Sequence, residues 1–161
     1  MLKVNIMLRI FAVQIIIICS TDAELVLIGE YPEVNDQIKT YYSDSSRRNY
    51  SDSKEFCAKV GSGYTIATVE TDTALKVLKE NRGKFSGTHW IGLKLGNLPG
   101  ILVWDEETDT VSQLNVEWKP VENRLSICGA YYSNETQYFR SLLCSLNYQV
   151  ICEHLRPKPT P

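Results

Sequence analysis

Trp90-Ile91-Gly92-Leu93 is followed, after a turn at Asn97-Leu98-Pro99-Gly100, by Val103-Trp104-Asp105. Aromatic and branched residues on both sides of a Pro-Gly turn predict two short strands joined as a hairpin. Large aromatic side chains in strands are most often buried. We therefore expect Trp90 and Trp104 in the hydrophobic core, and an acidic surface loop from Asp105 to Asp109.

Two short helices are predicted upstream of these strands. Asp52, with Glu55 three residues later, resembles a capping box that begins a helix, and Gly61 is placed to end it. Thr71 is a suitable N-cap for a second helix, which Asn81 closes. The apolar face of this second helix is predicted from helical spacing and consists of Ala74, Leu75 and Leu78.

Short strands account for most of the remaining sequence. A first strand is expected from Ile38 until the polar run 43–49 ends it. Three more are predicted in the last third, at Ile127–Tyr132, Tyr138–Cys144 and Tyr148–Cys152. Two helices followed by antiparallel strands are typical of an α+β domain. Residues 24–37 are expected to be a loosely structured lead-in, and residues 155–161 a Pro-rich tail.

The N-terminus has the layout of a secretory signal peptide. Lys3 and Arg9 form a basic segment, and an apolar stretch from Ile10 to Cys19 precedes small residues. This stretch is shorter than the ~20 residues that a membrane-spanning helix needs, which favours a cleaved peptide over an anchor. We expect cleavage after Ala23, so that residues 1–23 are removed and no membrane span remains.

Removal of the signal peptide changes the cysteine count. The chain has five cysteines, and loss of Cys19 leaves four, an even number that suits two disulfides in a secreted protein. Spacing alone allows three pairings of four cysteines. The sequons at Asn49 and Asn134 are candidate glycosylation sites of such a protein.

The overall charge excludes one class of partner. Seventeen Lys and Arg against nineteen Asp and Glu give a net charge of −2. A chain without a basic surface cannot neutralise a phosphate backbone, so we expect no nucleic-acid partner.

The sequence from about Tyr41 to His154 resembles a C-type lectin-like domain. The resemblance rests on residues 49–57, NYSDSKEFC, on the WIGL motif at 90–93, on Trp104-Asp105, on Trp118 and on four ordered cysteines. It implies a C-type lectin-like fold over residues 38–154, with two short helices on small antiparallel sheets and a long irregular loop region. It also implies the disulfides Cys57–Cys152 and Cys128–Cys144.

The resemblance further implies where a calcium-dependent sugar site would lie. In calcium-binding members, a Glu-Pro-Asn or Gln-Pro-Asp triplet after the equivalent of Trp118 and a Trp-Asn-Asp triplet before the third cysteine supply oxygen ligands. Here the first segment, residues 118–123, keeps Glu122 and Asn123 but lacks the proline between them, and the second has Arg140 in a ligand position. Ile127 replaces the acidic residue that usually precedes Cys128. We therefore expect no calcium at the usual site, with Glu122 and Asn123 as weak candidate metal ligands.

The sequence contains few of the residue types that enzymatic sites use. The chain has only two histidines, His89 and His154, which leaves little for a zinc site or a Ser-His pair. The acidic residues of 105–109 could form a pair of carboxylates for glycoside hydrolysis. A charged loop is the more common explanation of such a cluster.

The predicted function is that of a secreted, non-enzymatic recognition module for an extracellular protein or glycan, and the family resemblance implies a role in immune recognition or modulation. The candidate ligand-binding residues are Trp118, Lys119, Glu122, Asn123 and Arg140. One alternative is a calcium-dependent lectin with a degenerate site around Glu122 and Asn123. A secreted hydrolase is the alternative from another class.

Overall fold

The computed structural model describes residues 24–33, 36–95, 102–105, 127–134 and 139–159. Their elements, in chain order, are β1 (Val26–Pro32), β2 (Gln37–Arg48), α1 (Tyr50–Val60), β3 (Tyr64–Ile66), α2 (Asp72–Glu80), the 3-10 turn η1 (Arg82–Lys84), β4 (Thr88–Leu95), β5 (Leu102–Trp104), β6 (Ile127–Tyr132), β7 (Phe139–Leu143) and β8 (Tyr148–Pro157).

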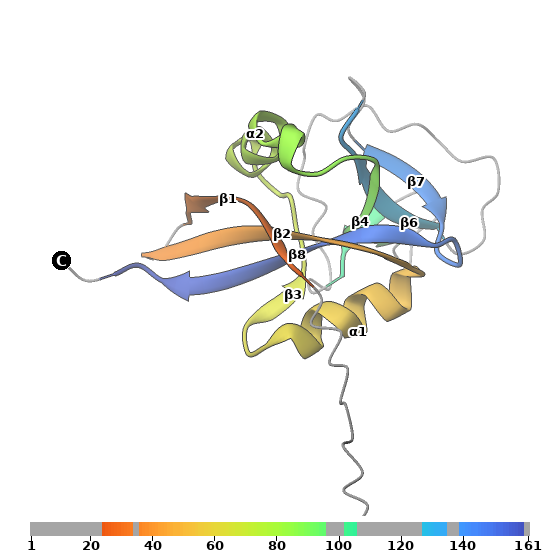
Figure 1. The fold of residues 1–161 in the computed structure, drawn as a ribbon, viewed down its shortest axis with the longest axis horizontal. Coiled ribbons are helices and arrows are strands. Elements are labelled where there is room, and N and C mark those ends of the chain that lie inside the picture. The colour runs from red at the N-terminus through yellow and green to blue at the C-terminus, as the bar shows by residue number, and fades with distance from the viewer. Residues whose placement is uncertain (1–23, 34–35, 96–101, 106–126, 135–138, 160–161) are drawn as a thin grey trace, which may run out of the picture.

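The described strands form one mixed sheet in the order β1-β2-β8-β4-β6-β7. In addition, β3 pairs with β8 and β5 pairs with β4. All pairs are antiparallel except β4 with β8, which run parallel. Figure 1 shows α1 and α2 on opposite sides of the ribbon formed by β1, β2 and β8. The α+β class is confirmed, with a single mixed sheet in place of small antiparallel ones.

The structure confirms both helices that the local sequence signals predict. Thr71 Oγ1 accepts a hydrogen bond from the Ala74 amide at 3.1 Å, and α2 ends at Asn81 as predicted. The first helix begins earlier than expected, because its N-cap is Asn49 and not Asp52. Asn49 Oδ1 accepts from the Asp52 amide at 2.9 Å.

Three boundaries differ from the sequence predictions. The lead-in at 24–37 contains β1, which pairs with β2 from Val26 to Pro32. The strand predicted to stop at the polar run 43–49 continues to Arg48, because buried polar contacts replace apolar packing there: Ser43 Oγ lies 3.2 Å from His89 Nε2. The predicted tail at 155–161 begins inside β8, whose residues to Pro157 pair with β2.

The helix α2 and the turn η1 pack against β1. A Cβ on Gly29 would lie 2.8 Å from Val77 on α2, so glycine permits this close packing of helix on strand. Lys84 Nζ donates to the Ile28 carbonyl at 2.8 Å.

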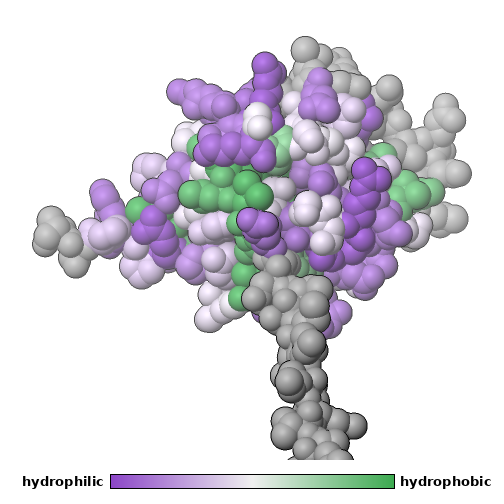
Figure 2. Space-filling view, viewed as in Figure 1, coloured by the Kyte–Doolittle hydropathy of each residue, from purple (hydrophilic) through white to green (hydrophobic). Residues whose placement is uncertain are grey.

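The core confirms the predictions for both tryptophans. Trp90 is fully buried and Trp104 nearly so. The disulfides are Cys57–Cys152 and Cys128–Cys144, the pairing that the family resemblance implies. The outer surface shown in Figure 2 is mainly hydrophilic, with small hydrophobic patches.

A buried ion pair fastens the segment before α2 to β8. The Glu153 carboxylate accepts from the Thr68 amide at 2.7 Å and from Thr68 Oγ1 at 3.0 Å, and lies 3.4 Å from Lys39 Nζ. Tyr41 Oη donates to the Thr68 carbonyl. Every charged atom of this cluster therefore has a polar partner, as a buried charge requires.

Two buried groups give opposite dependences of stability on pH. Burial raises the pKa of Glu153 from 4.5 to about 7, although Lys39 opposes the shift. The folded state then binds this proton more strongly, and the free energy of unfolding falls as pH rises from about 4.5 to 7. Burial lowers the pKa of His89 from 6.5 to about 4, so its contribution to that free energy rises with pH between these values.

Glu153 and His89 each change the free energy of unfolding by about 1.4 kcal/mol per pH unit, in opposite directions. We expect the two contributions to offset one another in the unmodified protein between about pH 4.5 and 6.5. Glu153→Gln should leave a free energy of unfolding that rises with pH in this range, and His89→Gln one that falls. Urea unfolding at several pH values measures both. Parallel profiles for the two variants would contradict the assignment, and Glu80→Gln on the exposed side of α2 is the control.

Candidate functional site

Part of the predicted ligand set lies beyond what the structure describes. Trp118, Lys119, Glu122 and Asn123 are outside the described residues, as is most of the acidic run that follows Asp105. Arg140, both sequon asparagines and the four disulfide cysteines are described. Asn134 is exposed, whereas Asn49 is half-buried and caps α1.

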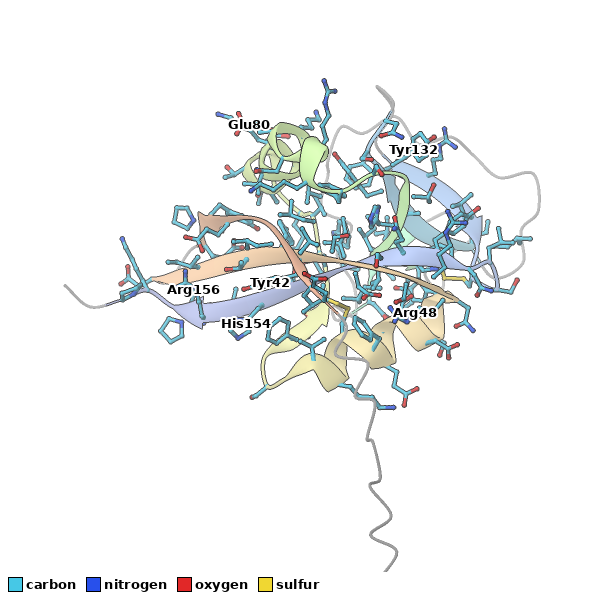
Figure 3. All side chains as sticks on the ribbon, in the orientation of Figure 1. Tyr42, Arg48, Glu80, Tyr132, His154 and Arg156 are labelled. Atoms are coloured by element: carbon cyan, nitrogen blue, oxygen red, sulfur yellow. A yellow bond between two sulfur atoms is a disulfide. The ribbon has the colours of Figure 1, made fainter. Side chains whose placement is uncertain are left out.

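Arg140 is held at the start of β7 by an aromatic ring. It lies opposite Ala130 of β6, and its guanidinium carbon is 4.2 Å from the centroid of the Tyr132 ring. Figure 3 labels Tyr132, on β6 close to β7. The neighbours of Arg140 in sequence, Phe139 and Ser141, are buried. The described start of β7 therefore carries a guanidinium at position 140 and a hydroxyl at position 141.

A second charged cluster surrounds Asp105, directly after β5. Lys54 of α1 contacts one oxygen of the Asp105 carboxylate and Lys94 of β4 contacts the other. Tyr50 Oη donates to the same carboxylate at 3.4 Å. The Asp105 side chain is 2% exposed, against 44% for each lysine. The prediction that Asp105 belongs to a solvated surface loop is wrong, because two lysines from distant elements enclose its carboxylate.

The protonation of Asp105 follows from these contacts. Burial alone would raise the pKa of Asp105, but hydrogen bonds and charges from Lys54 and Lys94 outweigh burial and hold the pKa below its ordinary value. An ionised carboxylate with both oxygens on ammonium groups is a poor proton donor for hydrolysis. The cluster is a structural ion-pair network with one excess positive charge.

An open cavity of about 600 Å³ lies next to this cluster. The described residues that line it include Tyr50, Lys94, Ile127, Cys128, Cys144 and Ser145. They come from the start of α1, from β4 and from the region of the Cys128–Cys144 disulfide. Lys94 therefore belongs both to the Asp105 network and to the cavity wall, whereas Lys54 does not line the cavity.

Sequence reasoning did not identify Lys54 or Lys94. Neither lysine belongs to a motif. Lys54 lies far from Asp105 in the chain, so no local signal points to that contact, whereas Lys94 lies opposite Val103 on the paired strand of the predicted hairpin, and this pairing could have indicated the second contact. Among the described residues, no group of three or more His, Cys, Asp and Glu side chains is placed to hold a metal ion. None of the described helices is long and apolar enough to span a membrane.

Comparison with known proteins identifies a family model that covers most of the described domain. The family model described as the lectin C-type domain matches residues 46–154. No curated protein sequence matches the chain.

Several solved structures share the fold at low sequence identity. Human lithostathine is 18% identical with a TM-score of 0.61, and the alignment covers 80% of this chain and 89% of that one. The mouse scavenger receptor C-type lectin carbohydrate-recognition domain is 17% identical, with a TM-score of 0.57 and coverage of 80% and 94%. Herring type II antifreeze protein is 17% identical, with a TM-score of 0.58 and coverage of 75% and 92%.

The Asp105 network makes a prediction for stability. Asp105→Asn leaves two ammonium groups close together without a counter-charge, and should lower the free energy of unfolding by about 2–4 kcal/mol. Lys54→Met leaves one ion pair in place and should cost about 1 kcal/mol. Urea unfolding at pH 7 measures both changes. The exposed pair Lys59–Glu55 is the control, since Lys59→Met should change the free energy of unfolding by less than about 0.5 kcal/mol. An equal effect of all three variants would show that the Asp105 network does not stabilise the fold.

Proposed function

Because this chain belongs to the C-type lectin domain family, we propose that it is an extracellular recognition module that binds a protein or glycan ligand without the family's usual calcium-dependent sugar site. The observation that carries this proposal is the position of Arg140. Where calcium-binding members are expected to have Trp-Asn-Asp, this chain has Phe139-Arg140-Ser141, and the arginine is fixed on the Tyr132 ring.

The described part of the site does not suit a calcium ion. Calcium takes six to eight oxygen ligands, chiefly carboxylates and carbonyls. Arg140 supplies a positive charge instead of an amide oxygen, and Ser141 supplies a hydroxyl on a largely buried side chain instead of a carboxylate. A guanidinium at this place carries the same sign of charge as a calcium ion and has no lone pair with which to ligate it.

Secretion is part of the proposal. The basic and apolar segments of residues 1–23 favour export, and both disulfides of the domain would form in an oxidising compartment. The exposed side chain of Asn134 is accessible for a glycan. A role in immune recognition or modulation fits an extracellular module of this build.

The Asp105 carboxylate does not support the alternative of a secreted hydrolase. Asp105 is ionised and enclosed by Lys54 and Lys94, so it lacks the accessible proton that a general acid needs. We therefore favour recognition over catalysis.

Calcium should leave the protein's thermal midpoint unchanged, since a ligand raises the midpoint only when the folded state binds it. We expect equal melting curves in millimolar calcium and in chelator, and no chelator-released binding to mannose or galactose resins. The double variant Arg140→Asn with Ser141→Asp restores two oxygen ligands and should gain stability from calcium.

A calcium-induced rise of several degrees in the unmodified protein, reversed by chelator, would instead support the alternative of a calcium-dependent lectin with a degenerate site. Loss of that rise in Glu122→Gln would then assign the ion to this segment.

A further inference from the structure

We propose that the cavity beside the Cys128–Cys144 disulfide binds a small amphiphilic anion, a hydrocarbon chain that carries one carboxylate or sulfate, with Lys94 contacting the charged group. This inference does not rest on the proposed function, because the cavity lies away from Arg140, the described residue of the calcium-ligand set. Arg140 is near the start of β7 and Cys144 follows its end, a separation of roughly 13 Å along the strand.

The size and lining of the cavity suit a small molecule with an apolar body. Its volume of about 600 Å³ is within the range of roughly 300–1,000 Å³ that is typical of ligand sites. The exposed part of its lining is mainly apolar, and Ile127 and the disulfide supply walls without hydrogen-bonding groups. Such walls favour a hydrocarbon chain, whose burial removes apolar surface from water.

Among the described residues, the charge beside the cavity is positive. Lys54 and Lys94 share the single carboxylate of Asp105, which leaves one positive charge uncompensated within this cluster. Of the two ammonium groups only that of Lys94 belongs to a residue lining the cavity. An anionic head group can therefore contact Lys94 while Asp105 keeps its bond to Lys54.

The walls are held in place before any ligand arrives. The Tyr50 amide donates to the Cys144 carbonyl at 3.0 Å, which joins the start of α1 to the end of β7. Lys94 lies opposite Cys128 in the β4–β6 pair, and the Tyr50 ring packs edge-on against Trp90 at 5.7 Å. A preformed site loses little conformational freedom on binding.

The polar groups that the described residues contribute to the lining are too few for a sugar. Asn49 also lines the cavity, but its side chain is committed to Asp52, whose amide it caps and whose carboxylate its Nδ2 reaches at 2.8 Å. The hydroxyls of Ser51 and Ser145 remain. Sugar recognition requires several convergent donors and acceptors, whereas one ammonium on an apolar wall matches a single anionic head with a tail.

The test uses octyl sulfate as the probe and the unglycosylated protein with both disulfides formed, since Asn49 lines the cavity. Titration of ¹⁵N-labelled protein below the micelle concentration should give saturable shifts of the Lys94, Ile127 and Ser145 amide signals. Octyl glucoside, which has the same tail without charge, should bind at least about tenfold more weakly. Methyl sulfate, which has the charge without the tail, should cause no saturable shift.

Lys94→Met and Lys59→Met are a matched pair of variants. Each removes one ammonium that is paired with a carboxylate, but only Lys94 lines the cavity and Lys59 lies outside the Asp105 cluster. Octyl sulfate binding should weaken about tenfold or more in Lys94→Met and less than about threefold in Lys59→Met. Amide spectra and melting curves establish that both variants fold; if Lys94→Met does not, Lys94→Gln replaces it.

Equal weakening by both variants would overturn the proposal, because the charge would then act at a distance and not from the cavity wall. Equal affinity for octyl sulfate and octyl glucoside, shifts at residues away from the cavity, or no saturation would overturn it as well. None of these results bears on calcium binding, so the proposed function stands or fails separately.

Discussion

The position of β8 at the centre of the sheet is the constraint on which the rest of the domain depends. Although β8 is the last strand of the chain, β2, β3 and β4 all pair with it. Neighbouring side chains of a strand point to opposite faces, and here Cys152 is bonded to Cys57 of α1 while Glu153 holds Thr68 before α2. One strand thus fixes the two helices on their two sides, and folding must bring distant segments together before the sheet is complete.

Features with a local signal were predictable, and features that depend on distant partners were not. The cap at Thr71, the buried tryptophans and the order of the cysteines follow from short patterns. The strand β1 exists because β2 offers it a partner, and no periodicity in 24–37 reveals that. Asp105 shows the same limit in the site: its sequence neighbours predict a solvated loop, whereas Lys54 reaches its carboxylate from α1.

Positive charge occupies two places at the end of the molecule formed by β6, β7 and the start of α1. Arg140 lies over Tyr132 at the start of β7, and Lys94 shares Asp105 with Lys54 beyond the other end of that strand. Arg140 lies over an aromatic ring, and Lys94 contacts a carboxylate. Within the Asp105 cluster, the two lysines carry one positive charge that Asp105 does not balance.

The contact of η1 with β1 has a consequence for how the protein behaves at high concentration. An edge strand normally exposes unpaired carbonyl and amide groups, onto which a strand from another molecule can add. Here Lys84 Nζ donates to the Ile28 carbonyl, so this acceptor is not available to an incoming strand. The lysine therefore opposes strand addition at one position of β1, in a protein whose native pairing is completed only by its final strand.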